Sequence, residues 1–528
     1  MTAKPKVLIS DAMSPQAEAI FTARGVEVTV KTDLKPEELE AEIANYDGLA
    51  VRSSTKVTPQ ILKNAKKLKV IGRAGIGVDN VDVPAATQTG IVVMNTPFGN
   101  SITTAEHTIA LLMALARDIP QANASTHAGK WEKSKFMGQE LFGKTLGVIG
   151  CGNIGAIVAD RAVGLKMKVI AFDPFLSVDR AVELGVEKVE FDEMLNRADF
   201  ITIHTPMTAQ TKGIINADVI ARMKKGVRII NCARGGLIIE ADLKAALDSG
   251  HVAGAALDVF EVEPAKENPL FNHPKVVCTP HLGASTVEAQ ENVALQVAEQ
   301  MADFLLQGAI ANAINMPSVS AEDAPKLKPY MKLAEQLGSF AGQLATDDAH
   351  EIEIEYEGLV STLNIKPLTA LVLAGFLKPT MESVNIVSAP ARVKERGISV
   401  AETKREKAEN YQTIMRVTVT GTSGKFTIAG TIVGHEHPRV IDVNGLPTEA
   451  SLNEEMLYVL NKDQPGLIGA VGTILGNNKI NISNFNLGRI PGKDKAVALI
   501  SVDGRVPSEI VAEIANISQV ERVQVLKF

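Results

Sequence analysis

Residues 145–175, TLGVIGCGNIGAIVADRAVGLKMKVIAFDPF, constrain the fold of this chain more than any other stretch. An apolar run leads into three glycines, Gly150, Gly152 and Gly155, and a helical pattern follows before a second apolar run ends at Asp173. A strand, a helix and a second strand in this order form a βαβ unit, whose two strands are parallel. The segment therefore predicts a parallel sheet covered by helices.

The same segment has the chemistry of a dinucleotide site. The first glycine permits a tight turn, the second lets the backbone approach a pyrophosphate, and the third lets helix and strand pack closely. The amides of Asn153 and Ile154 at the helix N-terminus can donate to the anion. Asp173 can accept hydrogen bonds from a ribose diol and would repel a 2′-phosphate, which favours NAD over NADP. An isolated GxGxxG would more often be a plain turn, but here the full strand–helix–strand–Asp context is present.

The alternation of strand and helix patterns recurs in the first part of the chain and is lost in the last part. Its 528 residues allow about three or four domains. Strand and helix patterns alternate over 5–95 and over 145–282, with long helix candidates between and after these regions. Thr103 and Glu106 have capping-box spacing at the head of the first of these helices. The last 75 or so residues predict a βαββαβ module small enough to fold alone.

Composition excludes several classes of protein. The net charge of −7 and the absence of a basic block argue against nucleic acid as a partner. Apolar runs are too short to cross a bilayer, so we expect no membrane association and a cytoplasmic location. The three cysteines suit a reducing compartment, and we expect no metal site. His435, Glu436 and His437 are better explained as an exposed loop than as metal ligands.

Three candidate catalytic residues follow predicted strands of the second α/β region: Arg234 in IINCARGG, Glu263 in LDVFEVEP and His281 in VVCTPHLG. Loops at the carboxyl ends of parallel strands border the ligand crevice. A histidine can take the proton of a secondary alcohol during hydride transfer, a carboxylate can fix its tautomer, and a guanidinium can hold a substrate carboxylate. Singly, each residue could be a surface or turn residue. Together, behind a nucleotide motif, they indicate a dehydrogenase.

These segments resemble the D-isomer-specific 2-hydroxy-acid dehydrogenase family, in which Arg234, Glu263 and His281 match the catalytic positions. The resemblance implies an α/β fold with two Rossmann-like lobes and the active site between them. It also implies that the dinucleotide is surrounded by Gly150, Gly152, Asn153, Ile154, Gly155, Asp173, Thr205, Cys232, Ala233, Asp258 and Gly283.

Cations in the first lobe indicate a phosphorylated substrate. Arg52 and Ser53 follow the strand GLAV, and Arg73 and Gly75 follow KVIG, so both loops can face the cleft. Lys133 could add a third cation from a mobile or neighbouring segment. Arginines and backbone amides suit a phosphate. The alternative is that these cations form solvent-exposed ion pairs.

The whole chain resembles the long form of this family, which has an α+β intervening domain and a βαββαβ ACT domain. The resemblance implies NAD-dependent oxidation of 3-phosphoglycerate to 3-phosphooxypyruvate, which opens the phosphorylated route to L-serine. It further implies a homotetramer or homodimer. The expected domains are a substrate lobe (1–98 and 284–316), an NAD lobe (99–283), an intervening domain (317–452) and an ACT domain (453–528).

In the ACT-like tail, Asn461, Asp463 and Asn481 match positions that bind serine in related regulatory domains, with turn and cap roles as the alternative. Relatives often carry histidine or tyrosine at the position of Asn461. Two other functions stay open. One is a glyoxylate or hydroxypyruvate reductase of the same family, which needs no phosphate site. The other is a non-catalytic sensor of NAD or amino acids.

Overall fold

The computed structural model describes residues 4–319, 323–345, 348–381, 384–408, 410–422, 424–434 and 436–528. Its first lobe is built on a five-stranded parallel sheet in the order β2-β1-β3-β4-β5. The strands are β1 (Lys6–Ile9), β2 (Glu27–Val30), β3 (Gly48–Val51), β4 (Val70–Arg73) and β5 (Val92–Met94). The helices are α1 (Pro15–Ala23), α2 (Pro36–Glu42), η1 (Ile43–Asn45), α3 (Pro59–Asn64) and α4 (Val83–Thr89).

The nucleotide lobe has a seven-stranded parallel sheet in the order β12-β11-β10-β9-β6-β7-β8. The predicted strands are all present, and the two-residue strand β8 is additional. The strands are β6 (Thr145–Ile149), β7 (Lys168–Phe172), β8 (Glu187–Lys188), β9 (Phe200–Ile203), β10 (Val227–Asn231), β11 (Val252–Leu257) and β12 (Val276–Cys278). The helices are α5 (Ser101–Ala116), α6 (Ile119–His127), η2 (Lys133–Lys135), α7 (Asn153–Gly164), α8 (Val178–Glu183), α9 (Phe191–Arg197), α10 (Ala217–Arg222) and α11 (Glu240–Asp248).

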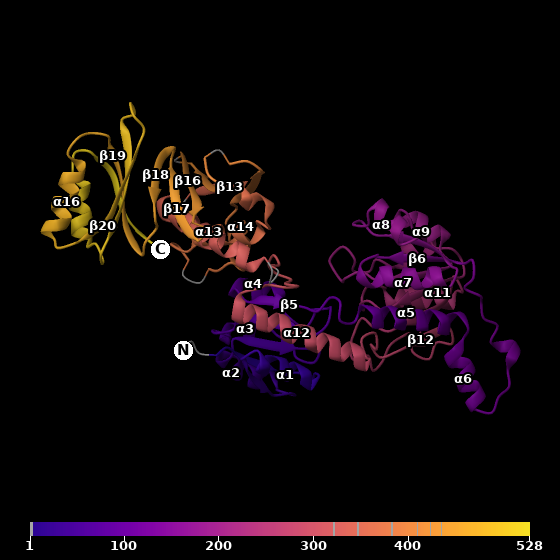
Figure 1. Cartoon of the computed structure of the whole chain (residues 1–528). Helices are drawn as coiled ribbons and strands as arrows, with labels where there is room; N and C mark the ends of the chain where they lie inside the picture. Colours follow the sequence, from indigo (N-terminus) through magenta and orange to yellow (C-terminus); the bar gives the residue numbers. More distant parts are fainter. Residues whose placement is uncertain are drawn as a thin grey trace.

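The chain crosses between the two lobes twice (Figure 1). After the first crossing, α5 packs against α7 and strands β10 to β12 of the nucleotide lobe. After the second, α12 (Val287–Gln307) packs against α1, β3 and β4 of the first lobe. The expected capping box on α5 is wrong, because the helix begins earlier, with Asn100 as its N-cap residue, and Thr103 and Glu106 therefore lie inside it.

The intervening domain follows as a six-stranded mixed sheet in the order β14-β13-β15-β16-β17-β18. Helix α13 packs on this sheet and lies so close to α14 that a Cβ at Gly338 would approach the carbonyl oxygen of Val372 to 2.1 Å. The elements are α13 (Ala324–Leu344), β13 (Ala349–Gly358), η3 (Leu359–Thr362), α14 (Lys366–Leu377), α15 (Ala389–Glu395), β14 (Ser399–Arg405), β15 (Thr413–Gly421), β16 (Gly424–Val433), β17 (His437–Val443) and β18 (Leu446–Ala450).

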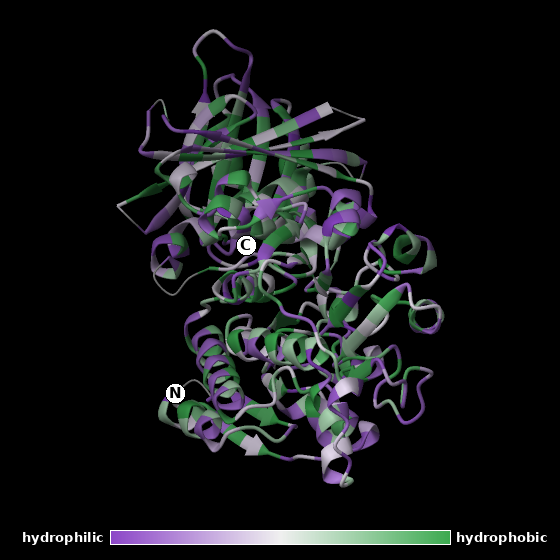
Figure 2. Cartoon of the chain, turned by 90° about the vertical axis from the view of Figure 1, so that its right-hand side faces the viewer, coloured by the Kyte–Doolittle hydropathy of each residue, from purple (hydrophilic) through white to green (hydrophobic). Residues whose placement is uncertain are grey.

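The C-terminal domain has the predicted βαββαβ order. Its antiparallel sheet has the order β20-β21-β19-β22. In Figure 2, many strand residues of these last two domains are hydrophobic. The elements are β19 (Glu455–Lys462), α16 (Leu467–Asn477), β20 (Ile482–Arg489), β21 (Lys495–Val502), α17 (Ser508–Ala515) and β22 (Val520–Lys527).

The C-terminal module has a core of its own between its sheet and helices α16 and α17, and the other face of this sheet shares a hydrophobic core with the intervening domain. The ring of Phe340 on α13 lies 6.2 Å from that of Tyr458 on β19 and 6.0 Å from that of Phe528. The same cluster of buried side chains continues through the intervening domain to Val297 and Met301 on α12. The first lobe has a second core on the other face of its sheet, and the nucleotide lobe has one core on each face of its sheet. The first lobe, the intervening domain and the C-terminal domain therefore form one packed body.

Candidate active site

The glycine turn after β6 lies at the point where the strand order of the nucleotide sheet reverses, between β6 and β9. Gly150 has φ +88°, and a Cβ at Gly155 would approach the carbonyl oxygen of Gly150 to 2.0 Å. A Cβ at Gly152 would meet nothing within 4 Å. Gly152 is also the N-cap of α7 and has no side chain to cover the first amides of this helix. The turn thus leaves open space in front of unpaired donors, as a pyrophosphate requires.

Polar groups around this turn fit NAD. Each carboxylate oxygen of Asp173 accepts one backbone amide, from Cys151 at 2.8 Å and from Phe175 at 2.8 Å, which fixes the carboxylate at the end of β7. Two buried polar atoms after β9, Nδ1 of His204 and Oγ1 of Thr205, have no hydrogen-bond partner among the described residues. Burial lowers the pKa of His204 to about 4. Buried polar atoms without partners are costly, so these two suit a polar ligand.

His281 and Glu263 are in direct contact. Nδ1 of His281 lies 2.7 Å from Oε2 of Glu263, whose other oxygen accepts the amide of Phe260 at 3.0 Å. The hydrogen bond to Glu263 raises the pKa of His281 against the opposing effect of burial. Burial raises the pKa of Glu263, but the hydrogen bonds from His281 and Phe260 outweigh it, and the net pKa is lowered. Since Nδ1 is engaged, Nε2 is the ring nitrogen that can exchange a proton with a bound hydroxyl.

The turn that carries His281 is held by Asp258, a residue with 0% exposure at the end of β11. Its carboxylate accepts the amides of Leu282 at 2.7 Å and Gly283 at 2.8 Å, and its carbonyl oxygen accepts the amide of His281 at 2.8 Å. His281 has φ +55°, an uncommon backbone conformation for a residue other than glycine. Asp258 and Gly283, predicted beside the dinucleotide, thus also form the support of His281.

Arg234 forms an ion pair with the first lobe. Its Nε donates to Oδ2 of Asp79 at 2.9 Å, and its Nη1 donates to the carbonyl oxygen of Ala233 at 2.7 Å. Asn231 shapes this loop, because its side chain accepts the amide of Ala233 and donates to the carbonyl of Arg234. Cys232 is buried, and burial raises the pKa of its thiol to about 12, which makes it unreactive.

Arg52 and Arg73 join Arg234 in a cationic cluster. Burial lowers the pKa of Arg73 to about 10, and the positive charges of Arg234 and Arg52 lower it too, while Asp79 and Asp11 act in the opposite direction. Nε of Arg73 is buried and has no partner among the described residues. The backbone of Arg52 is fixed by Asp11, which accepts its amide at 2.6 Å. The three guanidinium groups can receive a substrate that carries more than one negative charge.

The other predicted substrate residues differ in their burial and position. Gly75 is buried, and its amide donates to Oγ1 of Thr96 at 2.6 Å, whereas Ser53 is exposed. Lys133 is not brought to the arginine cluster. It lies on η2, with Nζ 5.9 Å from the centre of the Trp131 ring. Helix α6 and the segment after it extend from the side of the nucleotide lobe away from the first lobe (Figure 1), and no residue of α6 is buried. A contribution from Lys133 would therefore need a second copy of the chain.

The predicted effector residues lie at opposite ends of the C-terminal sheet. Asp463 follows β19, and its amide donates to the carbonyl of Asp494 at 2.8 Å. Asn481 precedes β20, and its side chain donates to Asp503 at 2.7 Å, beyond the far end of β21. Asn461 is buried, and its Oδ1 has no partner among the described residues. One chain therefore does not bring Asp463 and Asn481 into a single site.

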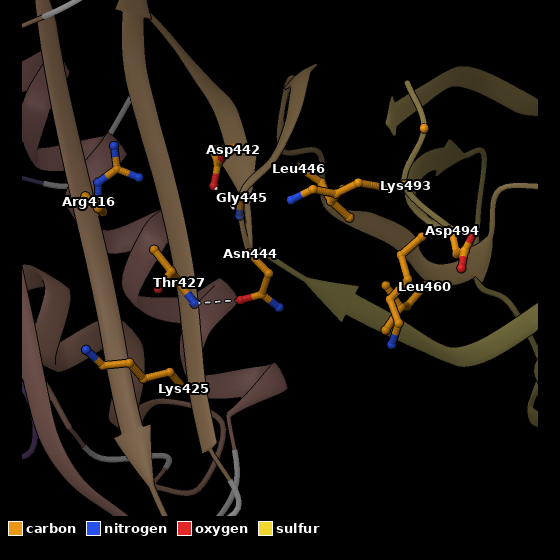
Figure 3. A pocket seen from close by; sticks show the side chains of 12 residues that line it. Arg416, Lys425, Thr427, Asp442, Asn444, Gly445, Leu446, Leu460, Lys493 and Asp494 are labelled. Carbon is orange, nitrogen blue, oxygen red and sulfur yellow. Dashed lines mark hydrogen bonds between the residues drawn. The ribbon is translucent and has the colours of Figure 1, made fainter. Parts of the chain in front are cut away.

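A hollow of about 880 Å³ lies beside Leu460, between the intervening and C-terminal sheets (Figure 3). Its side chains include four cations and two carboxylates. The residues that line it are Arg416, Lys425, Thr427, Asp442, Asn444, Gly445, Leu446, Leu460, Gly492, Lys493, Asp494 and Lys495. None of the predicted site residues is among them.

The described residues contain neither a metal site nor a membrane-spanning helix. No group of three or more His, Cys, Asp or Glu side chains is arranged there to hold a metal ion, and His435 lies outside the described residues. No helix in the described ranges is long and apolar enough to span a membrane.

Sequence reasoning missed Asp79, Asn231 and His107. Asp79 stands in the loop after Arg73, and its position opposite Arg234 depends on how the lobes meet. Asn231 directly precedes the CARGG segment, where an Asn at the end of a strand is a usable signal for a side chain that shapes the following turn. His107 stands in the predicted helix, where nothing in the sequence indicates its contact with Asp258.

Three family models match the chain. Residues 109–283 match the D-isomer specific 2-hydroxyacid dehydrogenase NAD binding domain, 326–444 the D-3-phosphoglycerate dehydrogenase intervening domain, and 456–519 the ACT domain. The D-3-phosphoglycerate dehydrogenase of Bacillus subtilis is 43% identical over 99% of both chains. That of Archaeoglobus fulgidus is 42% identical over 97% of this chain and 98% of the relative.

Solved structures resemble the two lobes. A glyoxylate reductase from Paecilomyes thermophila is 30% identical, with a TM-score of 0.56, and the match covers 60% of this chain and 99% of that one. A D-lactate dehydrogenase from Aquifex aeolicus, complexed with NAD and lactic acid, is 26% identical, with a TM-score of 0.53, over 59% of this chain and 100% of that one. With the full-length relatives and the site geometry, these matches show that the chain belongs to the D-isomer-specific 2-hydroxyacid dehydrogenase family, among the D-3-phosphoglycerate dehydrogenases that carry intervening and ACT domains.

Proposed function

We propose that the chain oxidises 3-phospho-D-glycerate to 3-phosphooxypyruvate with NAD, the first step of the phosphorylated route to L-serine. The observation that carries the proposal is the 2.7 Å contact between His281 and Glu263, in a site where the charge of Arg234 also acts on His281. Two relatives that are 42–43% identical over nearly the whole chain are both named D-3-phosphoglycerate dehydrogenase.

The chain's own residues account for the proton. NAD, held at the glycine turn and near Asp173, would supply the acceptor for the hydride that leaves C2 of the substrate. His281 takes the proton of the C2 hydroxyl on Nε2, so that the C–O bond becomes a carbonyl as the C–H and O–H bonds break. Glu263 keeps a proton on Nδ1 and stabilises the imidazolium that forms. In the reverse direction, the imidazolium gives its Nε2 proton to the carbonyl oxygen, which becomes the C2 hydroxyl.

The arginines account for substrate binding. Arg234 binds the substrate carboxylate, which replaces part of the contact between Arg234 and Asp79. Its Nη1 remains hydrogen-bonded to the carbonyl oxygen of Ala233. The phosphate binds in the first lobe, at Arg52, Ser53, Arg73 and the Gly75 loop. A phosphate and a carboxylate together neutralise the three guanidinium charges better than a carboxylate alone does.

The test compares NADH formation from 3-phosphoglycerate and from unphosphorylated D-glycerate. We expect a clear preference for the phosphorylated acid in kcat/KM, and a His281→Ala variant that loses turnover by about 10²- to 10⁴-fold with little change in NADH affinity. Equal rates with both acids would refute the phosphate assignment. Reduction of glyoxylate or hydroxypyruvate in preference to 3-phosphooxypyruvate would favour the alternative reductase. No turnover with any of these acids would favour a sensor.

For regulation, we propose that L-serine binds between two copies of the ACT domain. Asp463 and Asn481 lie at opposite ends of one sheet, so a site that uses both needs a second chain placed in the reverse direction. Under this proposal, L-serine binding requires a homodimer or a homotetramer. Calorimetric titration of L-serine into the full-length chain, with the mass measured by light scattering, tests both parts. Saturable serine binding to a monomer would contradict it.

A further inference from the structure

Helix α5 contacts the support of the catalytic turn through two side chains. Nε2 of His107 lies 3.2 Å from Oδ1 of Asp258 and 3.2 Å from Oγ1 of Thr279. Oγ1 of Thr104, one turn earlier on α5, donates to the carbonyl oxygen of Gly283 at 2.9 Å. The turn that carries His281 is therefore fixed both from β11 and from the first helix after the crossing between the lobes.

The hydrogen-bond directions define the role of His107. The hydroxyl of Thr279 donates to Asp258 at 2.6 Å, and the amide of Leu282 donates to the same carboxylate oxygen. With its proton committed to Asp258, Thr279 presents a lone pair to His107, and the carboxylate accepts only. Nε2 of His107 must therefore carry a proton and donate to both.

We propose that His107 is a positioning residue that holds the His281 turn, through Asp258 and Thr279, in the geometry that proton transfer requires. This inference rests on the proposed function for the role of His281. His281 adopts its left-handed backbone conformation only because the surrounding contacts fix it, and such conformations persist where the neighbouring structure over-determines them. Without the imidazole of His107, Asp258 still accepts the amides of Leu282 and Gly283, but it loses its hydrogen bond to α5.

The test uses full-length variants. His107→Leu removes the donor, and His107→Gln places an amide N–H near the position of Nε2. The matched control is His251→Leu, because His251 is also partly buried in the nucleotide lobe and bonded through Nε2, to the carbonyl of Met223, but precedes β11 at the opposite edge of the sheet. We expect His107→Leu to lower kcat by about 10- to 100-fold with little change in KM, as expected for a misplaced catalytic group, and both His107→Gln and His251→Leu to stay near the unsubstituted chain.

A second readout does not depend on turnover. Titration of the His281 imidazole, followed by NMR of histidine-labelled, NAD-free chain, reports the groups that face it, which are Glu263, Asp258 and Arg234. We expect His107→Leu to shift the His281 midpoint to lower pH, because a loosened turn weakens the bond to Glu263 that raises this pKa, and we expect His107→Gln to restore it. A purely structural role would change the melting temperature without this shift.

The outcomes separate the two proposals. Unchanged kcat and unchanged His281 titration in His107→Leu would overturn the positioning role, as would equal impairment of His107→Gln. If His107→Leu does not fold, His107→Asn keeps a polar side chain that is too short to bring its amide to the position of Nε2, and we expect the same changes; normal behaviour of this variant would then overturn the proposal. Absence of turnover in the unsubstituted chain would refute the proposed function, while the titration would still test the turn.

Discussion

Glu263→Gln is the most informative single substitution, since it removes the charge beside His281 with little change in shape. Two donors, Nδ1 of His281 and the amide of Phe260, each use one carboxylate oxygen of Glu263. A glutamine has only one oxygen, so one of these donors must face an NH₂ group. The charge and one hydrogen bond are lost together.

The size of the effect follows from the distance and the exposure. Two unit charges about 4 Å apart attract by about 1 kcal/mol in water and about 4 kcal/mol at an effective dielectric constant of about 20. The side chains of His281 and Glu263 are 52% and 34% exposed, so screening places the pair near the lower limit. A loss of about 1–2 kcal/mol of imidazolium stabilisation lowers kcat by about 5- to 30-fold.

The same substitution changes the pH dependence of oxidation. His281 acts as a base only when unprotonated, and its hydrogen bond to Glu263 raises its pKa, so kcat/KM rises as the pH rises through this raised value. Without the carboxylate the pKa falls toward its ordinary value, and the acidic limb of the profile moves to lower pH. The measurement is kcat/KM for NADH formation across the acidic range. An unchanged limb together with an unchanged plateau would refute the assignment of Glu263 as the partner of the base.

Three further substitutions test other parts of the site. Arg73→Gln should lower kcat/KM for 3-phosphoglycerate by about 10- to 150-fold, the value of a charge-assisted hydrogen bond, and leave D-glycerate nearly unaffected; equal losses on both acids would contradict a phosphate contact. Gly155→Ala should weaken NAD binding in titrations and destabilise the lobe by about 1–3 kcal/mol, because its Cβ would lie 2.0 Å from the carbonyl oxygen of Gly150; normal binding would contradict the tight turn. Asp463→Ala should abolish L-serine binding in calorimetry with turnover retained, and unaltered binding would place the effector elsewhere.

The nucleotide lobe and the positions of its candidate catalytic residues were the most predictable parts. Parallel strands bring their carboxyl ends to one edge, so residues after β6, β10 and β12 converge whatever the sequence distance between them. That is why Gly150, Arg234 and His281 could be placed together from the sequence.

Contacts that depend on tertiary packing could not be predicted. The ion pair of Arg234 with Asp79 joins residues 155 positions apart on different lobes, and no local pattern encodes such a pair. The left-handed conformation of His281 is imposed by Asp258, a residue 23 positions earlier in the printed sequence, rather than by its own propensity. The sequence also could not show which copy of the chain Lys133 would serve, since it lies on a segment that extends away from the first lobe.

The shared core of the last two domains has a consequence for how such a chain can be rearranged. The family matches end at residue 444 and resume at 456, which suggests a natural place to exchange one regulatory tail for another. A cut there would expose Phe340 on one piece and Tyr458 on the other, both almost fully buried in the intact chain. An exchanged tail must supply an apolar sheet face that fits α13, so the regulatory segment and its neighbour are expected to be inherited as a matched pair.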